Sequence, residues 1–388
     1  MKRFLIIPFV ALMMVTCSDI SIQTVNPPKG PSQGSTGGGE VVADVEAPHI
    51  FKARTNSYHT FRIPAIVKTK NGTLIAFCEG RVNSGGDTGN IDMICRRSSD
   101  NGKTWSKIIK IWDDGKNTCG NPSPVVDMET GRIHLLMTWN YETDGASAGD
   151  FNKEGATKDT RRVFYTYSDD DGVTWTDAKE ITTSTKLSNW GWYATGPCHG
   201  IILKHGAHKG RIVIPCDHNV KGGKGYSHVI YSDDKGKTWN IGGEVLGGNE
   251  SCVEELEDGR IFITCRQANC RLLAWSSDGG VTFTAGGSYT SLPDPRCQAS
   301  CIGTYRNGQQ VLLHCNCANS SSRTMLTIKA SLDGGKKWSA GHTVWEKPTA
   351  YSDMVMIDDQ TIGVFYENGD SKSYERISFE TVKVVNCL

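Results

Sequence analysis

The sequence lacks an excess of charge of either sign, with 42 Lys and Arg residues against 42 Asp and Glu residues in 388. A chain with balanced charge is not drawn electrostatically to nucleic acid or to an anionic membrane surface. We therefore expect no nucleic-acid partner. Any anionic ligand must be bound by a local group of cations.

Metal-binding spacings are also missing, although the chain contains 14 cysteines and 10 histidines. No CxxC pair and no close Cys/His cluster occurs, so we expect no metal, and we predict no organic cofactor either. Some cysteines could pair in an exported protein, but for most of them we expect burial as apolar thiols.

Long hydrophobic runs are confined to the N-terminus. The apolar run from Phe4 to Val15 follows a basic start and is too short to span a bilayer as a mature helix. Residues 1–17 are therefore predicted to be an export signal. Its end at Cys17 resembles the lipobox of bacterial lipoproteins, in which the cysteine is lipidated. We expect a membrane-anchored lipoprotein, periplasmic or at the cell surface, with ordinary secretion as the alternative.

Residues 18–46 are rich in Gly, Ser, Pro and Val, a composition that cannot bury enough apolar surface to order itself. They are predicted to be a flexible tether that precedes one globular domain at residues 47–388. Contact with a membrane would then be made only through the N-terminal lipid. We expect the protein to be a monomer.

One eight-residue pattern recurs five times in the predicted domain: Ser, any residue, Asp, any residue, Gly, any residue, Thr or Lys, and an aromatic residue. Each copy follows a short strand-like run and precedes another, which indicates a hairpin turn. The Asp side chain can accept backbone N–H groups ahead of it, and Gly supplies a positive φ, so we expect a structural role for these aspartates. The copies begin at Ser98, Ser168, Ser232, Ser276 and Ser331 and contain Asp100, Asp170, Asp234, Asp278 and Asp333.

A four-stranded unit repeated around an axis is a β-propeller, an architecture that leaves only short, protected sheet edges. Residues 47–388 have room for six units, so we predict an all-β, six-bladed β-propeller. The longest gap between two copies holds the polar stretch from Tyr141 to Arg161, which is predicted to be a rim loop.

The eight-residue repeat is similar to the Asp-box of sialidases, and Phe61-Arg62-Ile63-Pro64 matches the FRIP motif that opens their catalytic domain. The chain is therefore identified as a member of the BNR/Asp-box sialidases, or neuraminidases, of glycoside hydrolase family 33, and it resembles bacterial exo-α-sialidases. The resemblance implies the propeller fold and the removal of terminal sialic acid. The expected partners are sialylated glycans: glycoproteins, gangliosides and oligosaccharides.

Sialic acid carries a carboxylate on its anomeric carbon, and the family binds this group with three arginines. Guanidinium groups suit the task because they form paired, charge-assisted hydrogen bonds with carboxylates. The resemblance places the three at Arg62 in the FRIP motif, at Arg266 and at Arg323.

The same carboxylate would repel a carboxylate nucleophile, and sialidases are a known exception to the two-carboxylate scheme because they use tyrosine. The resemblance makes Tyr351 the nucleophile and Glu250 the base that takes its proton. Glu254 and Glu255 are the alternatives to Glu250 as this base. For Glu254 and Glu255 we expect structural or surface roles instead. The implied reaction retains anomeric configuration through a tyrosyl-enzyme intermediate.

A proton for the leaving oxygen would come from Asp87, which lies in a Gly-flanked loop. Asp92 is the alternative, but it lies at the start of a strand-like run. By the same resemblance, Arg81 is expected to assist in the substrate pocket. Glu367 is expected to pair with Arg62 and to orient it rather than to react.

Three other functions remain open. A propeller lectin would bind sialic acid without hydrolysing it, and a trans-sialidase or intramolecular trans-sialidase would use nearly the same residues. An Asp-box hydrolase could also act on a different acidic sugar. The aromatic segment from Trp190 to Tyr193 is expected either to line the pocket or to pack in the core.

Overall fold

In the computed structural model of the protein, residues 44–144, 161–220 and 223–388 are described. The predicted export signal at 1–17, the lipobox cysteine Cys17 and most of the predicted tether lie outside these residues. Within them, helices are few and short: α1 (Thr182–Thr185) and the 3-10 turns η1 (Glu142–Asp144), η2 (Gly206–His208) and η3 (Val384–Cys387).

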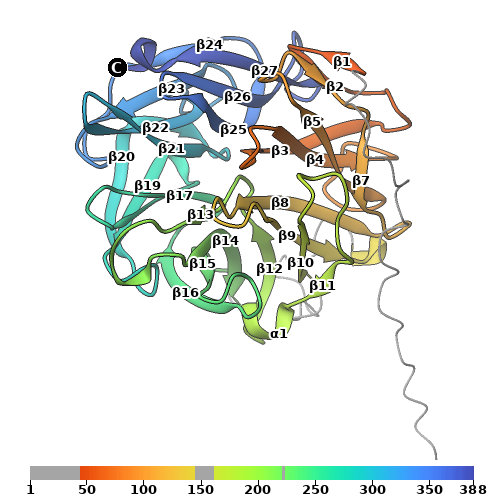
Figure 1. Cartoon of the computed structure of the whole chain (residues 1–388), viewed down its shortest axis with the longest axis horizontal. Coiled ribbons are helices and arrows are strands. Elements are labelled where there is room, and N and C mark those ends of the chain that lie inside the picture. The colour runs from red at the N-terminus through yellow and green to blue at the C-terminus, as the bar shows by residue number, and fades with distance from the viewer. Residues whose placement is uncertain (1–43, 145–160, 221–222) are drawn as a thin grey trace, which may run out of the picture.

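Antiparallel sheets surround a common centre in chain order, as Figure 1 shows. The prediction of an all-β, propeller-like architecture is confirmed. The largest sheet holds β3 (Thr60–Lys68), β4 (Leu74–Arg81), β5 (Ile91–Ser98), β7 (Ile109–Trp112), β8 (Thr118–Val126), β9 (Ile133–Asn140), β10 (Arg162–Ser168) and β11 (Lys179–Glu180). Its two halves, β3 to β7 and β8 to β11, are joined by one parallel bridge from Ile91 to Thr118.

The remaining strands form smaller sheets. Three follow in chain order: β12 (Trp190–Thr195), β13 (Ile201–Ile202), β14 (Ile212–Val220), β15 (Gly225–Ser232) and β16 (Asn240–Leu246); then β17 (Ser251–Glu255), β18 (Ile261–Cys265), β19 (Ala268–Ser276) and β20 (Thr284–Pro295); then β21 (Ser300–Arg306), β22 (Gln309–Cys317), β23 (Leu326–Ser331) and β24 (His342–Trp345). The last contains β25 (Thr349–Asp358), β26 (Thr361–Asn368), β27 (Arg376–Lys383) and β2 (His49–Lys52).

The ring is closed by that last sheet, because β2 from the start of the domain pairs with β27 from its end, Phe51 opposite Ile377. The first strands of the sheets face the centre. There β3 contacts both β25 and β8, and β21 contacts both β17 and β25. Residues on these inner strands are therefore the ones placed to form a central site.

The core lies between neighbouring sheets. One apolar cluster joins Phe51, Phe365 and Phe379 of the closing sheet to Phe61 of the largest sheet and to Trp105, which follows the first repeat turn. Similar clusters lie between the other neighbouring sheets. The described residues include thirteen cysteines, all of them free and buried, which confirms the expectation of buried thiols.

The repeated motif forms the turn that was predicted. In the first copy, Asp100 accepts Thr104 N–H at 3.0 Å and Thr104 Oγ1–H at 2.7 Å, while Ser98 Oγ accepts Gly102 N–H at 2.9 Å. Gly102 has a φ of 87° and lies so close to Phe379 of the preceding sheet that a Cβ there would be 2.1 Å from the ring. Each turn therefore also holds its sheet against a neighbour.

Residues 44–46, at the end of the predicted tether, contact the domain. Val45–Glu46 forms the short strand β1, which pairs with β6 (Thr104–Trp105). Asp44 Oδ2 also lies 2.7 Å from Arg96 Nη1. A bulk composition rich in small residues could not reveal this pairing, because it is made with a turn sixty residues further on. No helix among the described residues is long and apolar enough to cross a membrane.

Candidate active site

A cavity of about 290 Å³ lies at one end of the centre of the ring. Seven of the eight site residues inferred from the sequence line it, and the eighth, Glu367, lies directly behind Arg62. The lining comprises Arg62, Ile63, Glu79, Arg81, Asp87, Asn121, Arg161, Trp192, Asn249, Glu250, Arg266, Arg323, Tyr351 and Tyr374.

Arg62 is directed into the cavity by a bulge in β3. The register of β3 against β4 shifts between Arg62 and Ala65, and Ile63 has a φ of 62°, a conformation that β-branched residues avoid. Glu367 holds this backbone in place by accepting Ile63 N–H at 2.9 Å. It also accepts Arg62 Nε–H at 3.0 Å and Nη2–H at 3.1 Å. Because Glu367 is completely buried, this two-pronged pair fixes the guanidinium plane.

Arg266 follows β18 directly and joins two of the candidate catalytic groups. Its Nη1 donates to Glu250 Oε2 at 2.6 Å and to Tyr351 Oη at 2.8 Å. The backbones of Arg266 and Glu250 are also joined, by an N–H to carbonyl bond of 2.8 Å. The position of Arg266 is therefore set both by the sheet and by the carboxylate.

Arg323 precedes β23 and also lines the cavity. Its Nη1 donates to Tyr374 Oη at 2.7 Å, and its guanidinium carbon is 5.6 Å from the centre of the Tyr351 ring. Tyr374 also lies under Arg62, whose guanidinium carbon is 4.1 Å from the Tyr374 ring centre. One tyrosine thus positions two arginines, by a hydrogen bond and by a cation–π contact.

Tyr351, on β25, is where the three arginines meet. Arg266 contacts its hydroxyl, and the guanidinium carbons of Arg62 and Arg323 lie 4.9 and 5.6 Å from its ring centre. Its hydroxyl donates to Glu250 Oε1 at 2.6 Å. Burial and the Glu250 carboxylate raise the pKa of Tyr351 well above its usual value, although Arg266 and Arg62 oppose them. The phenol is therefore protonated at neutral pH, and its proton lies in the hydrogen bond to Glu250.

Asp87 lies on the loop between β4 and β5, with a side chain 63% exposed. Its Oδ1 is 2.8 Å from Arg81 Nη1 and 3.5 Å from Arg62 Nη1. Burial would raise the pKa of Asp87, but the two guanidinium groups outweigh burial and lower it. Arg81 is itself held by Glu79 at 2.6 Å and by the carbonyl of Gly85 at 2.7 Å.

The alternatives to these residues lie elsewhere. Asp92 is buried outside the cavity, accepting the hydroxyl of Tyr58 at 2.7 Å and pairing with Lys110 at 2.9 Å. Glu254 accepts Gly303 N–H, and Glu255 accepts the N–H groups of Lys204 and His205, so both act as backbone acceptors. The five repeat aspartates accept bonds within their own turns and do not line the cavity.

Six lining residues were not identified from the sequence as site residues: Ile63, Glu79, Asn121, Arg161, Asn249 and Tyr374. Arg161 is almost fully buried and donates to Asn121 Oδ1 at 2.6 Å, while its guanidinium carbon lies 4.0 Å from the Trp192 ring centre. Of the aromatic segment, Trp192 lines the cavity, whereas Trp190 packs in the core. Most of the predicted rim loop lies outside the described residues.

The site is built for anions. Five arginines converge on it, and three of its acidic groups, Glu79, Glu250 and Asp87, are paired with arginine. Within the ranges that the structure describes, no group of three or more His, Cys, Asp or Glu side chains could hold a metal ion. The chemistry available is carboxylate binding, proton transfer and attack by a phenol.

Comparison with known proteins identifies the family. The model of the BNR repeat-like domain matches residues 72–364. A sialidase of Clostridium perfringens is 33% identical over 289 residues, which is 68% of this chain and 72% of that protein. This chain belongs to the sialidase family. A sialidase-family exo-alpha-sialidase of Aspergillus fumigatus is 28% identical over 348 residues, covering 82% of both chains.

Other members of the family are longer, since the chain spans 63% of a Bacteroides fragilis sialidase that is 30% identical over 84% of it. Among solved structures, the Hadza microbial sialidase Hz136 superimposes with a TM-score of 0.78 at 28% identity, covering 88% of this chain and 69% of that one. The sialidase fold and the arginine-lined cavity therefore occur together in this chain.

Proposed function

We propose that this protein is an exo-α-sialidase that hydrolyses terminal sialic acid from glycoproteins, glycolipids or oligosaccharides with retention of configuration. The observation that carries the proposal is the meeting of Arg62, Arg266 and Arg323 around the Tyr351 phenol. A carboxylate bound by the three guanidinium groups would hold the anomeric carbon that bears it beside that phenol. The family membership of the chain supports the same substrate.

In the first half of the reaction, the bond between the anomeric carbon and the leaving oxygen breaks while Asp87 gives that oxygen its proton. The Tyr351 oxygen bonds to the anomeric carbon as Glu250 takes the phenol proton. Arg266, which donates to both Glu250 and Tyr351, stabilises the charge that develops on this pair. The product is a covalent sialosyl-tyrosine.

In the second half, the Asp87 carboxylate takes a proton from water, whose oxygen attacks the anomeric carbon. The tyrosyl oxygen leaves and recovers its proton from Glu250. Two displacements at one carbon give net retention. The exposed loop of Asp87 suits a residue that must reach first a leaving glycan and then water.

The competing functions differ in product. A lectin would need the arginines without the acid, base and nucleophile, and all three of these residue types stand in this cavity. A trans-sialidase would transfer sialic acid to another glycan, and an intramolecular trans-sialidase would release an anhydro sugar. A hydrolase for another acidic sugar would leave sialosides intact.

The decisive experiment is hydrolysis of 4-methylumbelliferyl α-sialoside with the sugar product followed by NMR. We expect free α-sialic acid to appear first, before it mutarotates. A 2,3-difluorosialic acid should add its mass to the peptide that contains Tyr351, and Tyr351→Phe should lose both the adduct and turnover. Binding of sialic acid without turnover would identify a lectin, and an anhydro product or transfer to lactose would identify a trans-sialidase.

Three features of the whole chain belong to the same proposal. The ring is taken to have six blades, with the eight-stranded sheet counted as two because only one parallel bridge joins its halves. The protein is taken to be exported, as a lipoprotein anchored at Cys17 or as a secreted protein, and to act as a monomer. Labelling with a radioactive fatty acid, compared between the natural chain and Cys17→Ser, tests the anchor.

A further inference from the structure

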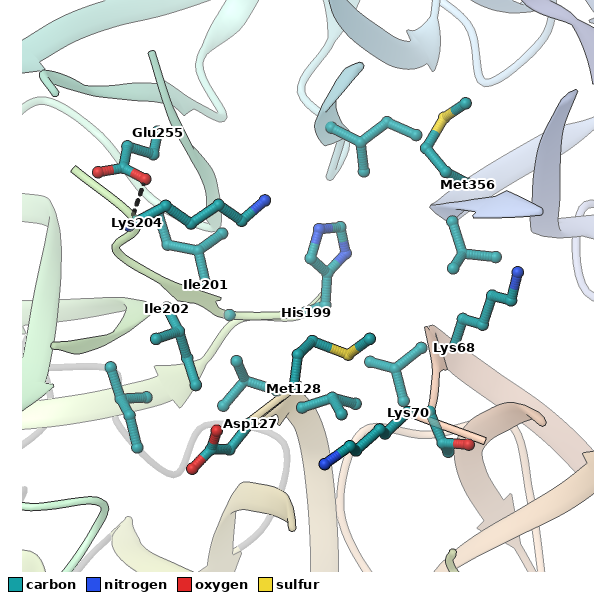
Figure 2. A pocket seen from close by; sticks show the side chains of 18 of the residues that line it. Lys68, Lys70, Asp127, Met128, His199, Ile201, Ile202, Lys204, Glu255 and Met356 are labelled. Carbon is teal, nitrogen blue, oxygen red and sulfur yellow. Dashed lines mark hydrogen bonds between the residues drawn. The ribbon is translucent and has the colours of Figure 1, made fainter. Parts of the chain in front are cut away.

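A second and larger cavity, of about 1130 Å³, is lined by residues further along the inner strands (Figure 2). We call it the channel cavity. It shares inner strands with the candidate active site but no lining residue. On β3, Arg62 lines the active site while Ile66 and Lys68 line the channel cavity; on β25, Tyr351 and Met354 are divided in the same way. At about 3.3 Å per residue, the two sites lie roughly 10 to 15 Å apart along the strands.

Asp353 ties the inner strands together between the two cavities. It is completely buried, and its Oδ2 accepts the N–H groups of Ile66 at 2.9 Å and of His199 at 3.1 Å. Its Oδ1 lies 2.7 Å from His199 Nδ1. This junction joins three segments of the ring and marks the inner end of the channel cavity.

His199 presents a polar group to the channel cavity. Figure 2 shows its imidazole standing in the middle of the opening. Its Nδ1 is hydrogen-bonded to Asp353, while its Nε2 has no hydrogen-bond partner among the residues that the structure describes. Burial lowers the pKa of His199, but the Asp353 carboxylate outweighs burial and raises it to about 9. The ring is therefore a cation at neutral pH, and its Nε2–H is available to an anion.

Lysines add to this positive charge, whereas the nearby acidic side chains accept hydrogen bonds or form ion pairs with other residues. Lys204 is exposed, and its side chain makes no ion pair among the described residues; in Figure 2 its ammonium extends toward the middle of the cavity. Glu255 accepts backbone N–H groups. Asp127 and Glu129 both pair with Lys235, at 3.7 and 2.8 Å. His199, which is paired with Asp353, and Lys204 are thus the cationic groups in the middle of the cavity, and Glu254, which also lines it, accepts Gly303 N–H.

The wall around these cations is largely apolar. Met128 is 58% exposed, which is unusual for a large apolar side chain, and it faces the opening together with Met356 and Ile201 (Figure 2). Methionine side chains are flexible and adapt to hydrocarbon of varied shape. A glycan would leave most of its hydroxyl groups unpaired against such a wall.

We propose that the channel cavity binds an organic anion with a hydrocarbon body, of the chemical class of a medium-chain fatty acid. The carboxylate contacts His199 Nε2 and Lys204, and the chain lies against Met128, Met356 and Ile201. This binding site is separate from the sialoside site and does not depend on the function proposed above.

Dodecanoate below its micellar concentration is the probe, measured by isothermal titration calorimetry on the chain expressed with Cys17→Ser. We expect binding of one molecule per chain. Lys204→Glu and Met128→Glu should each weaken it about tenfold or more, because one places a like charge at the headgroup and the other a charge against the chain. Lys336→Glu is the matched control, because Lys336 is an exposed lysine in the turn after β23. It should change the affinity for dodecanoate less than twofold.

The channel-cavity variants should hydrolyse a fluorogenic sialoside like the parent chain, which shows that they are folded. If the parent itself lacks sialidase activity, near-ultraviolet circular dichroism serves as the folding control and leaves this test unaffected. Absence of dodecanoate binding, or equal affinity in the parent, Lys204→Glu and Met128→Glu, would overturn the proposal. So would displacement of dodecanoate by sialyllactose, or binding only to phosphatidylglycerol vesicles.

Discussion

The hydroxyl of Tyr351 donates to Glu250 Oε1 over 2.6 Å, and Arg266 Nη1 contacts both groups. Glu250 is the acceptor best placed to take the phenol proton. Glu250→Gln should therefore lower kcat by about 10²- to 10⁴-fold with little change in KM, as expected for loss of a general base. Steady-state hydrolysis of a fluorogenic sialoside measures both. Glu255→Gln is the control, because Glu255 accepts backbone N–H groups and lies beside His205 outside the active-site cavity. A variant at Glu250 that keeps a tenth of the activity contradicts the role of general base.

Glu367 is expected to matter for both stability and substrate binding. Glu367→Gln removes the buried counter-charge of the Arg62 guanidinium and leaves only the exposed and more distant Asp87, which costs roughly 3 kcal/mol in comparable buried pairs. KM should rise because the guanidinium plane is no longer fixed. Urea unfolding and steady-state kinetics test this together. Asp370→Asn breaks exposed ion pairs with Lys347 and Arg376 and should leave the unfolding midpoint almost unchanged.

The pH dependence of the reaction should change when the ion pair between Arg81 and Asp87 is removed. Arg81 contributes to the lowered pKa of Asp87, so Arg81→Met should raise that pKa. Because the acid acts in its protonated form, the fall of kcat/KM on the alkaline side should move to higher pH by about one unit. Arg97→Met removes an arginine that pairs with Asp171 away from the cavity and should not move the profile. A downward shift in Arg81→Met would refute the assignment.

Stability should decline in alkaline solution through His199. Its pKa rises from 6.5 to about 9 in the folded chain, so its contribution is complete below about pH 6.5 and is lost as the pH rises through about 9. At about 1.4 kcal/mol per pH unit, the loss is roughly 3 kcal/mol. Urea unfolding at pH 6.5, 8 and 9.5 measures it. His199→Gln should flatten the dependence, whereas the surface variant His59→Gln should preserve it.

The turns of the repeat provide a test of sheet-to-sheet packing. Gly335 and Gly308 both have positive φ, but a Cβ on Gly335 would lie 2.6 Å from Phe262, whereas one on Gly308 would meet nothing within 4 Å. Gly308→Ala should cost about 1 kcal/mol for its backbone conformation. Gly335→Ala should cost about 1 to 3 kcal/mol more because the neighbouring sheet must move. Equal losses in thermal unfolding would contradict close packing at Gly335.

Features that depend on residues close together in the sequence could be predicted more completely than features that depend on residues far apart in the chain. The repeat was predictable because the hydrogen bonds of Ser and Asp that shape its turn lie within eight residues, and the FRIP motif marked the strand that carries Arg62. Tyr374 and Arg161 were not found, since a single residue in a polar loop carries no sign of the distant strands that it will meet. The channel cavity was missed for the same reason. It is assembled from the ends of strands that belong to different sheets.

The pairing of Arg62 with Glu367 has a consequence for incomplete chains. These residues are 305 positions apart, and the strand β27 that completes the last sheet begins only at Arg376. The pair of Arg62 and Glu367 can form only when both ends of the domain are present, because each residue comes from one of them. A molecule truncated before β26 therefore keeps Arg62 but lacks the carboxylate that orients it, so an incomplete chain has an incomplete arginine site.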